Sequence, residues 1–380
     1  MIYLDNSSTT SPKPEEVCIA VEKYMRNNFG SPGRSVNTSN KEKDVVLETR
    51  ELIGKLIHME DPYRIVFTCS ATDSLNLALK GYLKKGDHVI ITSLEHNSVL
   101  RPLKYMEIEG LIEVSVIYAD KFGYVNPDEI QAEIKSNTKL IATTHASNVI
   151  GTIVDIETIG QIAALNDVKY LVDASQSIGA IEIDVNQNHV DLLAIPGHKN
   201  LFGPAGIGAL YIKEGINLAP FRHGGTGTAS ESLMQPELMP HKYESGTANL
   251  IGIAGLNAGI KFIFSVGMEK IRKHEEELSD YMYKELLNIS GVTIYGTDKA
   301  YDKTSVISLN IKNEKASVIG QKLLDEFNIM TRAGLHCAPL THKTIGTESR
   351  GTVRFGIGYF NTKEDIDASL EAIDTLCKRL

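Results

Sequence analysis

The sequence has few cysteines, no cluster of basic residues and no long apolar run, and each absence excludes a class of protein. Its four cysteines, at positions 18, 69, 337 and 377, lie far apart without paired spacing, which argues against a disulfide framework and against a zinc site. The net charge is -9 and no segment is rich in Lys or Arg, so neither nucleic acid nor a membrane surface is the expected partner. No apolar run approaches the length that spans a membrane.

Targeting features are also absent from the start of the sequence. The segment MIYLDNSSTT has neither a basic stretch followed by an apolar core nor a cleavage site, so we expect a cytoplasmic protein. With 380 residues, of which 42% are hydrophobic and 23% are charged, the chain is long enough for one large and one smaller globular domain. The partner that this composition favours is a small molecule.

Short apolar runs alternate with helical segments from residue 65 onward. This rhythm is typical of a doubly wound α/β domain with a mostly parallel sheet of about seven strands. The expected strands cover residues 65–67, 88–92, 114–118, 140–143, 170–172, 192–195 and 209–212.

Helices and a second, smaller domain flank this region. Helical spacing is expected over 15–25 and 41–57, and the Gly/Ser/Asn-rich segment 27–40 between them either lines a site or forms an ordinary surface connection. Beyond residue 249, a long helical region to about residue 287 precedes an α+β domain with strands over 292–295, 305–311 and 352–357 and helices over 317–327 and 363–378. We therefore predict a large domain over 16–260 and a small domain over 261–380, which the N-terminal arm 1–15 joins.

Polar residues at the ends of two expected strands give the main functional signal. Asp173 follows the strand 170–172, and Lys199 follows the strand 192–195 in the segment PGHK. Ligands of an open parallel sheet bind outside the carboxyl ends of its strands, so both side chains can face one small molecule. Such a pair suits pyridoxal phosphate, because Lys199 can form an imine with the cofactor aldehyde while Asp173 keeps the pyridine nitrogen protonated. The alternative is two unrelated surface charges, against which the flanking Gly and Pro argue because they mark a tightly shaped loop.

Other polar segments also follow expected strands. The small residues from Cys69 to Thr72 open a helix, so their backbone N–H groups can hold a phosphate, although the same residue types are ordinary helix caps. His96 can stack on a planar ring and relay protons, or simply cap a helix. Asn148 can bind a cofactor oxygen or a substrate carboxylate, or belong to a simple turn. Gln176 can reach the phenolic oxygen of the cofactor.

These segments resemble those of a known family. The motifs SATDSLNLA, LEHNS, ASNVIGT, VDASQ and PGHK, in this order and spacing, resemble class V aminotransferases of pyridoxal phosphate fold type I, and the resemblance covers essentially the whole chain. Within that family, MTRAGLHCAPLTHK and TVRFGIGYFNTKEDID resemble the active-site cysteine segment and the carboxylate-binding segment of the cysteine desulfurase and selenocysteine lyase group with a short cysteine loop.

The resemblance implies a cofactor role for each matching residue. Lys199 would be the imine lysine, Asp173 the partner of the pyridine nitrogen, and His96 the residue that stacks on the ring. Thr247 would come from the second subunit of a homodimer and bind the phosphate across the interface. The implied cofactor-binding residues are Ala71, Thr72, His96, Asn148, Asp173, Gln176, His198, Lys199 and Thr247, of which Thr72 and His198 would hold the phosphate within the chain.

The resemblance also implies a reaction. Lys199 or His96 would remove the α-proton of the substrate cysteine, and the Cys337 thiolate would take its sulfur as a persulfide, which leaves alanine and passes the sulfur to an acceptor protein. A planar guanidinium holds a carboxylate by two parallel hydrogen bonds, which is the role implied for Arg354. The implied substrate-binding residues are Asn148, Arg332 and Arg354.

Cys337 differs from the other cysteines in its surroundings. Arg332 and His336 nearby would favour its thiolate, and the flanking Gly and Pro suggest an exposed, shaped loop. The other three cysteines lie in helical patterns or at a strand end and are expected to pack as small hydrophobic residues. Cys69, beside the phosphate turn, is the only rival nucleophile.

Some residues depart from the family pattern, and the departures concern both phosphate and substrate contacts. Ala71 stands where a second hydroxyl residue is common, Pro196 stands where a Ser is frequent, and Leu335 replaces a frequent His. The segment 221–247 is also elaborate for a plain sulfur-mobilising enzyme. We therefore expect a cysteine desulfurase dependent on pyridoxal 5'-phosphate. The alternatives are a selenocysteine lyase or other carbon–sulfur β-lyase and, more distantly, a catalytically silent binding module.

Overall fold

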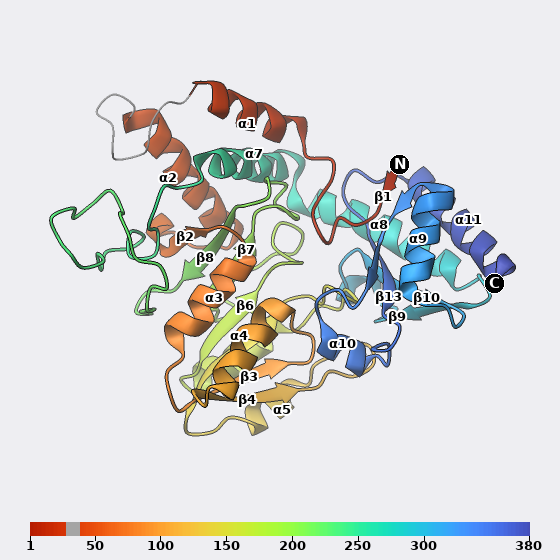
Figure 1. Ribbon diagram of the computed structural model, residues 1–380, viewed down its shortest axis with the longest axis horizontal. Coiled ribbons are helices and arrows are strands. Elements are labelled where there is room, and N and C mark those ends of the chain that lie inside the picture. Colours follow the sequence, from red (N-terminus) through yellow and green to blue (C-terminus); the bar gives the residue numbers. More distant parts are fainter. Residues whose placement is uncertain (28–38) are drawn as a thin grey trace.

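The computed structural model describes residues 1–27 and 39–380 of the chain. The prediction for the segment 27–40 therefore lies almost entirely outside the described residues. Two sheets of different size organise the described part, and Figure 1 shows the smaller one, in blue, beside the larger one.

All seven predicted strands of the large sheet are present. They are β2 (Ile65–Thr68), β3 (Asp87–Thr92), β4 (Ile112–Ile117), β5 (Thr138–Thr144), β6 (Lys169–Asp173), β7 (Leu192–Pro196) and β8 (Gly208–Ile212). Their order in the sheet is β2-β8-β7-β6-β5-β3-β4. The strands from β7 to β4 are parallel, and β8 runs antiparallel to both of its neighbours. The predicted, mostly parallel α/β sheet is confirmed.

Helices cover both faces of this sheet, because successive residues of a strand point to opposite sides. On β3, Ile90 belongs to one buried cluster, whereas Val89 and Ile91 belong to another. The first cluster includes residues of the helices α2 (Ser39–Leu56), α5 (Pro127–Ala132), α6 (Ile156–Leu165) and α7 (Leu250–Val266). The second includes residues of α3 (Ala71–Tyr82) and α4 (Asn97–Ile108). Helix α1 (Glu15–Asn27) packs on α7.

The smaller sheet is antiparallel and has four strands in the order β12-β13-β10-β9. Its strands are β9 (Val292–Tyr295), β10 (Val306–Ile311), β12 (Arg332–Gly334) and β13 (Thr352–Gly356), of which β12 was not predicted. Residues of α8 (Met268–Leu286), α9 (Ala316–Phe327) and α11 (Lys363–Arg379) form its core. Apart from a two-stranded pair described below, the remaining elements are α10 (Pro339–Thr344) and two 3-10 turns, Pro62–Arg64 and Ala300–Asp302.

The predicted boundary between the domains, at residue 260, falls inside helix α7. The division at this residue stays a prediction. The polypeptide turns sharply after this helix, at Gly267, where φ is 94°. No single helix of the described residues is long and apolar enough to cross a membrane, and only α7 and α8, bent by 80° at their junction, meet that test as a pair.

The N-terminal segment crosses from the large sheet to the small one. Residues Ile2–Tyr3 form a strand, β1, that pairs in parallel with β11 (Ile329–Met330). Leu4 is fully buried in the core of the small sheet. In Figure 1 the red N-terminus accordingly lies against the blue C-terminal part of the chain. Neither strand of this pair was predicted.

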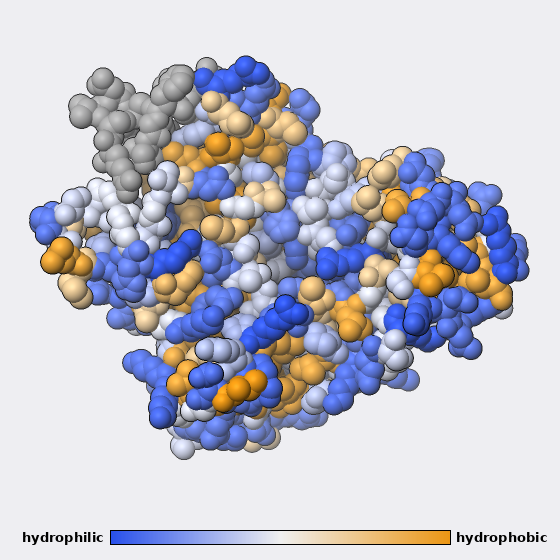
Figure 2. All heavy atoms as spheres, viewed as in Figure 1, coloured by the Kyte–Doolittle hydropathy of each residue, from blue (hydrophilic) through white to orange (hydrophobic). Residues whose placement is uncertain are grey.

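A long connection without helices or strands joins β8 to α7 over residues 213–249. It carries three strongly exposed apolar side chains, Leu233, Met234 and Leu238. Figure 2 shows apolar side chains at the tip of this loop, which Figure 1 draws in green. The segment that looked elaborate in the sequence is therefore a large projection from the body of the protein.

Candidate active site

A cavity of about 210 Å³ lies between the two sheets, at the carboxyl ends of β5, β6 and β7. Its position agrees with the rule that ligands of open α/β sheets bind outside the carboxyl ends of the strands. Its walls contain ten of the predicted site residues, namely Ala71, Thr72, His96, Asn148, Asp173, Gln176, His198, Lys199, Arg332 and Arg354. The other two predicted site residues, Cys337 and Thr247, are not among the described residues that line it.

Lys199 and Asp173 reach this cavity from neighbouring strands. Asp173 ends β6 and is buried, and the backbone N–H of Ser175 donates to its Oδ1 at 2.9 Å. Lys199 follows β7 after Gly197, where a Cβ atom would lie 2.8 Å from the carbonyl oxygen of Ile207, so only glycine fits there. Burial lowers the pKa of Lys199 to about 8, although the nearby Asp173 charge opposes this shift. The site thus holds an amine that loses its proton near neutral pH.

The predicted phosphate turn is the start of helix α3. Ser70 caps this helix by accepting a hydrogen bond from the backbone N–H of Asp73 at 3.2 Å. The N–H groups of Ala71 and Thr72, in the first turn, have no partner within the helix. Such groups and the positive end of the helix dipole favour an anion. The helix cap is therefore present, and the same segment can also hold a phosphate.

His96 is held in one orientation by the start of helix α4. Its Nδ1 accepts a hydrogen bond from the backbone N–H of Ser98 at 3.1 Å, which makes it the cap of that helix. A backbone amide can only donate, so a neutral His96 carries its proton on Nε2. Burial lowers the pKa of His96, an effect that Asp173 opposes and Lys199 reinforces. The neutral ring therefore presents a donor, not a free lone pair, on its Nε2 side.

The polypeptide around His198 is fixed by the N-terminal arm. The carbonyl oxygen of His198 accepts hydrogen bonds from the Thr9 hydroxyl at 3.1 Å, the Thr10 amide at 3.2 Å and the Lys13 ammonium at 2.7 Å. The Thr10 hydroxyl donates to the carbonyl oxygen of Lys199 at 2.8 Å. Burial, together with the Lys199 and Lys13 charges, lowers the pKa of His198 to about 4, so its ring is neutral at physiological pH.

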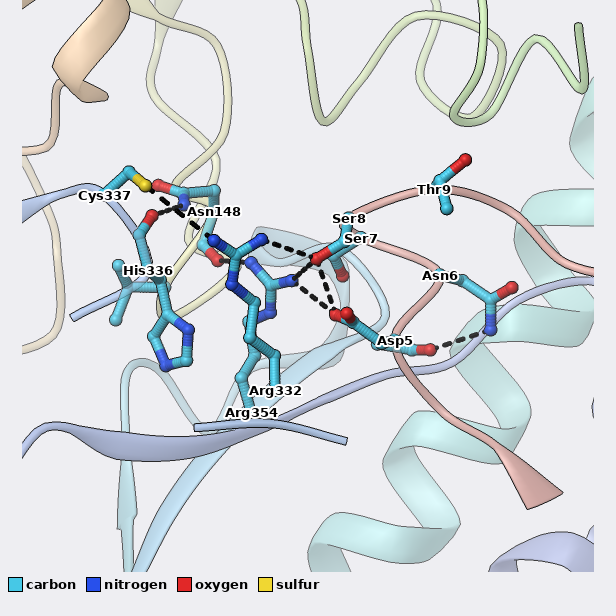
Figure 3. Close-up of polar contacts among 12 residues, drawn as sticks. Asp5, Asn6, Ser7, Ser8, Thr9, Asn148, Arg332, His336, Cys337 and Arg354 are labelled. Carbon is cyan, nitrogen blue, oxygen red and sulfur yellow. Dashed lines mark hydrogen bonds and ion pairs between the residues drawn. The ribbon is translucent and has the colours of Figure 1, made fainter. Parts of the chain in front are cut away.

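Arg354 is buried in strand β13. Its Nη1 donates to the carbonyl oxygen of Asn148 at 2.8 Å, and its Nη2 donates to Asp5 Oδ1 at 2.7 Å and to Ser8 Oγ at 2.8 Å (Figure 3). Its Nε is buried and has no partner among the described residues. A donor is therefore left over for an incoming acceptor such as a carboxylate.

Cys337 directly follows His336, a residue of the cavity wall, on a strained loop. His336 and Cys337 both have positive φ angles, 48° and 59°, which side chains other than glycine rarely adopt. The side-chain amide of Asn148 holds this loop by donating to the carbonyl oxygen of His336 at 2.7 Å. Nη2 of Arg332 lies 3.7 Å from the sulfur of Cys337. Backbone strain of this kind is typical of functional sites, since a structure keeps it only where the surroundings impose it.

Two expectations about cysteine surroundings were wrong. Burial lowers the pKa of His336 to about 2, and its ring points away from the Cys337 sulfur in Figure 3, so it supplies no positive charge to a thiolate. Cys18 and Cys69 are exposed and do not pack as small hydrophobic residues, whereas Cys377 is buried. Only Arg332 remains as the cationic neighbour predicted for Cys337.

Several site residues were missed in the sequence. Asp5, Ser7 and Ser8 belong to the N-terminal arm, yet both serines line the cavity and Asp5 pairs with Arg354. Ser98 also lines the cavity and joins the hydroxyl of Thr72 at 2.7 Å. The run of small polar residues DNSSTT, followed by an amphipathic helix, was the available signal, but only the fold reveals what lies against it.

Pyridoxal phosphate fits the donors of this cavity. An amine and a buried carboxylate lie in one cavity, as the imine and the pyridine nitrogen require, and the start of α3 offers free amides for the phosphate. Nδ1 of His198, a residue of the cavity wall, is buried without a partner among the described residues. An orphaned nitrogen beside a helix N-terminus is what a phosphate oxygen would satisfy.

Comparisons with known proteins give the same result. The family model described as Aminotransferase class-V matches residues 2–368. A probable cysteine desulfurase of Methanothermobacter thermautotrophicus is 34% identical over 383 residues, which cover 99% of this chain and 94% of the relative. The cysteine desulfurase IscS of Dictyoglomus turgidum is 31% identical, over 100% of this chain and 95% of its own.

Solved structures resemble the fold closely. The apo cysteine desulfurase of Thermococcus onnurineus NA1 has a TM-score of 0.93 and 31% identity, over 100% of this chain and 95% of that chain. The cysteine desulfurase CsdA of Escherichia coli has a TM-score of 0.89 and 26% identity, with the same coverage of 100% and 95%. These neighbours confirm the predicted fold type I. With a family model that matches nearly the whole sequence and relatives above 30% identity, the chain belongs to the class V aminotransferase family.

Proposed function

We propose that this protein is a cysteine desulfurase dependent on pyridoxal phosphate, which transfers the sulfur of L-cysteine to Cys337 and releases L-alanine. One observation carries the proposal: a cysteine on a strained loop lies beside Arg332, which lines the same cavity as Lys199 and Asp173. A plain aminotransferase needs no thiol there. The relatives and structural neighbours named as cysteine desulfurases support the same activity.

The cofactor supplies an electron sink that stabilises negative charge on the substrate α-carbon. Asp173, a buried carboxylate in the cavity wall, would pair with the pyridine nitrogen and support this role. Thr72, His198 and the first amides of α3 would hold the phosphate, and Gln176 would lie beside the phenolic oxygen. Gln176 donates to the carbonyl oxygen of Ser7 at 3.1 Å, which fixes its amide at that edge of the cavity.

Lys199 is the better candidate for removing the α-proton. Its lowered pKa, about 8, gives it far more free amine near neutral pH than an ordinary lysine has. His96 is poorly prepared for this task, because its Nδ1 lone pair already accepts from Ser98 and its Nε2 carries the proton. We infer that His96 stacks on the cofactor ring and donates a hydrogen bond, and that Lys199 moves the proton.

The substrate carboxylate would bind on the small-sheet side of the cavity. Arg354 offers its unpartnered Nε, and Arg332 places a second positive charge beside it. The amide of Asn148 already holds the cysteine loop, so its contribution to binding would be to position that loop. Because Arg332 also lies beside the sulfur of Cys337, one guanidinium serves both the carboxylate end and the sulfur end of the substrate.

We further infer a homodimer in which Thr247 reaches the phosphate of the partner's cofactor. Thr247 is exposed and is not among the described residues that line its own cavity. The projecting loop over 213–249 carries the exposed Leu233, Met234 and Leu238, which a second copy can cover. The acceptor of the persulfide sulfur would be another protein. The cytoplasmic location expected from the sequence stays a prediction.

The decisive experiment replaces Cys337 with Ser and follows alanine and persulfide formation from cysteine. We expect the variant to retain the bound cofactor and to lose several decades of rate, each worth about 1.4 kcal/mol of barrier, because a covalent acceptor is removed. Cys69→Ser, which changes an exposed thiol beside the phosphate turn, is the matched control and should keep near wild-type rates.

The same assay separates the alternatives. A selenocysteine lyase would release selenium from selenocysteine in both wild type and Cys337→Ser, while cysteine would be a poor substrate for the wild type. If Cys337→Ser still produces alanine and persulfide at a near wild-type rate, the proposed desulfurase mechanism is wrong. Formation of pyruvate in place of alanine would indicate a β-lyase.

A further inference from the structure

Asp5 gives Arg354 a charge partner that the other arginine of the cavity lacks. Its Oδ1 accepts a hydrogen bond from Arg354 Nη2 at 2.7 Å and one from the Ser8 hydroxyl at 2.7 Å (Figure 3). Arg332 also lines the cavity and donates to the Ser8 hydroxyl at 2.9 Å, but it forms no ion pair with any other described residue. The chain itself therefore offsets one of the two guanidinium charges and leaves the other for a ligand.

The contacts of Arg354 also limit how it can hold a carboxylate. Both N–H groups of Nη2 are used, because this nitrogen donates to Asp5 and to Ser8. A guanidinium holds a carboxylate by two parallel hydrogen bonds through Nη2 and either Nη1 or Nε, so each of these arrangements needs Nη2. Nε itself is buried and has no partner among the described residues. With Asp5 in place, a ligand carboxylate is thus left with a single hydrogen bond from Nε.

The position of the Asp5 carboxylate does not depend on Arg354 alone. The carbonyl oxygen of Asp5 accepts from the amide of Ser8 at 3.0 Å, and its backbone pairs with Gly356 at the end of the strand that carries Arg354. Asp5 is not among the described residues that line the cavity, so its effect on a ligand there passes through Arg354 or through its charge. A neutral side chain of the same shape should therefore leave the arm in place.

We propose that Asp5 is a positioning residue that holds Arg354 in place and weakens the binding of carboxylates to it, so that an amino acid is oriented at the site but still released. This inference rests on the proposed function, whose product, L-alanine, carries the carboxylate that must leave. Two carboxylates on one guanidinium repel each other, so the charge of Asp5 weakens the binding of the second. Tight binding of the product would slow its release without favouring the transition state.

Asp5→Asn tests the charge separately from the shape. Asparagine keeps an oxygen that accepts from Arg354, but it has no charge. The holoenzyme is titrated with L-alanine and with L-alaninamide, a neutral amide in place of the carboxylate, and the absorbance of the cofactor reports binding. We expect the Kd of alanine to fall about tenfold in Asp5→Asn and the Kd of alaninamide to change by less than about twofold, because only alanine carries the like charge. Inhibition of the reaction by alanine should strengthen by the same factor as its binding.

Two further variants separate charge from structure. Asp5→Glu retains the charge and should keep the wild-type ratio of the two Kd values. Asp298→Asn removes an exposed carboxylate that is not part of the cavity wall, and as the matched control it should change neither Kd. Thermal unfolding and cofactor content identify a variant that has lost its structure. If Asp5→Asn does not fold, Asp5→Ser supplies a second neutral side chain for the same comparison.

The inference and the proposed function fail in different ways. If the two Kd values change by the same factor in the neutral variant, or if alanine binds more weakly, Asp5 does not weaken carboxylate binding and the inference is wrong. The proposed function still stands in that case, provided that the wild type makes alanine from cysteine. If the wild type makes no alanine from cysteine, the proposed function fails and the inference falls with it.

Discussion

The hydroxyl groups of Thr72 and Ser98, near the starts of helices α3 and α4, lie 2.7 Å apart. Ser98 also lies 2.9 Å from Nδ1 of His96, so a continuous chain of hydrogen bonds runs from the start of α3 to His96. Two helix N-termini consequently point to the same end of the cavity. A doubly charged phosphate is the kind of group that two such termini favour.

Replacing Ser98 with Ala should weaken the binding of pyridoxal phosphate. The change leaves the Thr72 hydroxyl without its partner and removes the hydroxyl contact of His96 Nδ1, which keeps the backbone N–H of Ser98 as a donor. The loss of one or two hydrogen bonds should raise the Kd by about tenfold. Equilibrium titration of the apo protein with the cofactor measures this. Ser136→Ala, in an exposed loop, is the control. An unchanged Kd would mean that the Thr72–Ser98 contact has no part in holding the phosphate.

Reduction of the purified protein with borohydride should attach the cofactor to Lys199. Peptide mapping by mass spectrometry identifies the labelled lysine. Lys13 is the informative competitor, because its ammonium binds the carbonyl oxygen of His198 at 2.7 Å and burial lowers its pKa to about 8 as well. Lys13→Ala should keep the label on Lys199, and Lys199→Ala should abolish it. A label on Lys13 would refute the site assignment.

Mixing two inactive variants tests whether the site is shared between subunits. If Thr247 reaches the partner's phosphate, a hybrid of Lys199→Ala and Thr247→Ala chains contains one site with both defects and one site with neither. Activity should then recover to roughly a quarter of the wild-type value when equal amounts exchange freely, because half of the dimers are hybrids and each has one intact site of two. Exchange is verified separately with tagged chains. Exchange without recovery would place each complete site within one chain.

The sequence predicts the large sheet well because its strands repeat one pattern. Each is a short apolar run, and a buried parallel sheet imposes that pattern on every strand, as the fully buried β7 illustrates. The strands β1, β11 and β12 have only two or three residues, too few for any periodicity to appear. Their existence depends on partners far away in the sequence.

The candidate site divides in the same way. Lys199 and Asp173 could be predicted because strand ends meet at one edge of a parallel sheet. The pairing of Arg354 with Asp5 could not, because it joins residues 349 positions apart and no local pattern encodes it. The exposure of Cys69 was missed for a related reason. Whether a residue just after a buried strand is covered depends on the loop that packs over it. Here the only side chain of the long loop described as contacting the Cys69 sulfur is Arg222, whose Nη1 lies 3.9 Å away.

Acid should destabilise the apo protein partly through buried histidines. Burial lowers the pKa of His145 to about 4, well below the ordinary value of about 6.5. As the pH falls from 6.5 toward 4, the unfolded chain takes up a proton before the folded one does, so the stability that this group contributes is complete above pH 6.5 and is lost as the pH falls.

Urea unfolding at pH 7 and pH 5 measures this loss. In His145→Asn, the decrease in the free energy of unfolding between the two pH values should be smaller by about 1–2 kcal/mol than in the wild type. The pH dependence is the informative quantity, since the variant also changes stability at pH 7. His223→Gln, at an exposed position, should retain the wild-type dependence. An unaltered dependence in His145→Asn would mean that His145 does not resist protonation in the folded state.

The docking of the N-terminal arm has a consequence for the order in which the enzyme matures on the ribosome. Strand β1 pairs with β11 at residues 329–330, and Asp5 forms an ion pair with Arg354. The first residues to be synthesised therefore contact residues that are synthesised near the end. At about 5–20 residues per second, residues 1–5 of the arm remain undocked for roughly twenty seconds to one minute of translation. Thr9, Thr10 and Lys13 can contact His198 and Lys199 earlier. During that time the parallel sheet can form around Lys199 and Asp173, but the carboxylate and sulfur sides of the cavity do not yet exist. A nascent chain that binds the cofactor early would therefore be unable to release sulfur until its C-terminal sheet has closed over the arm.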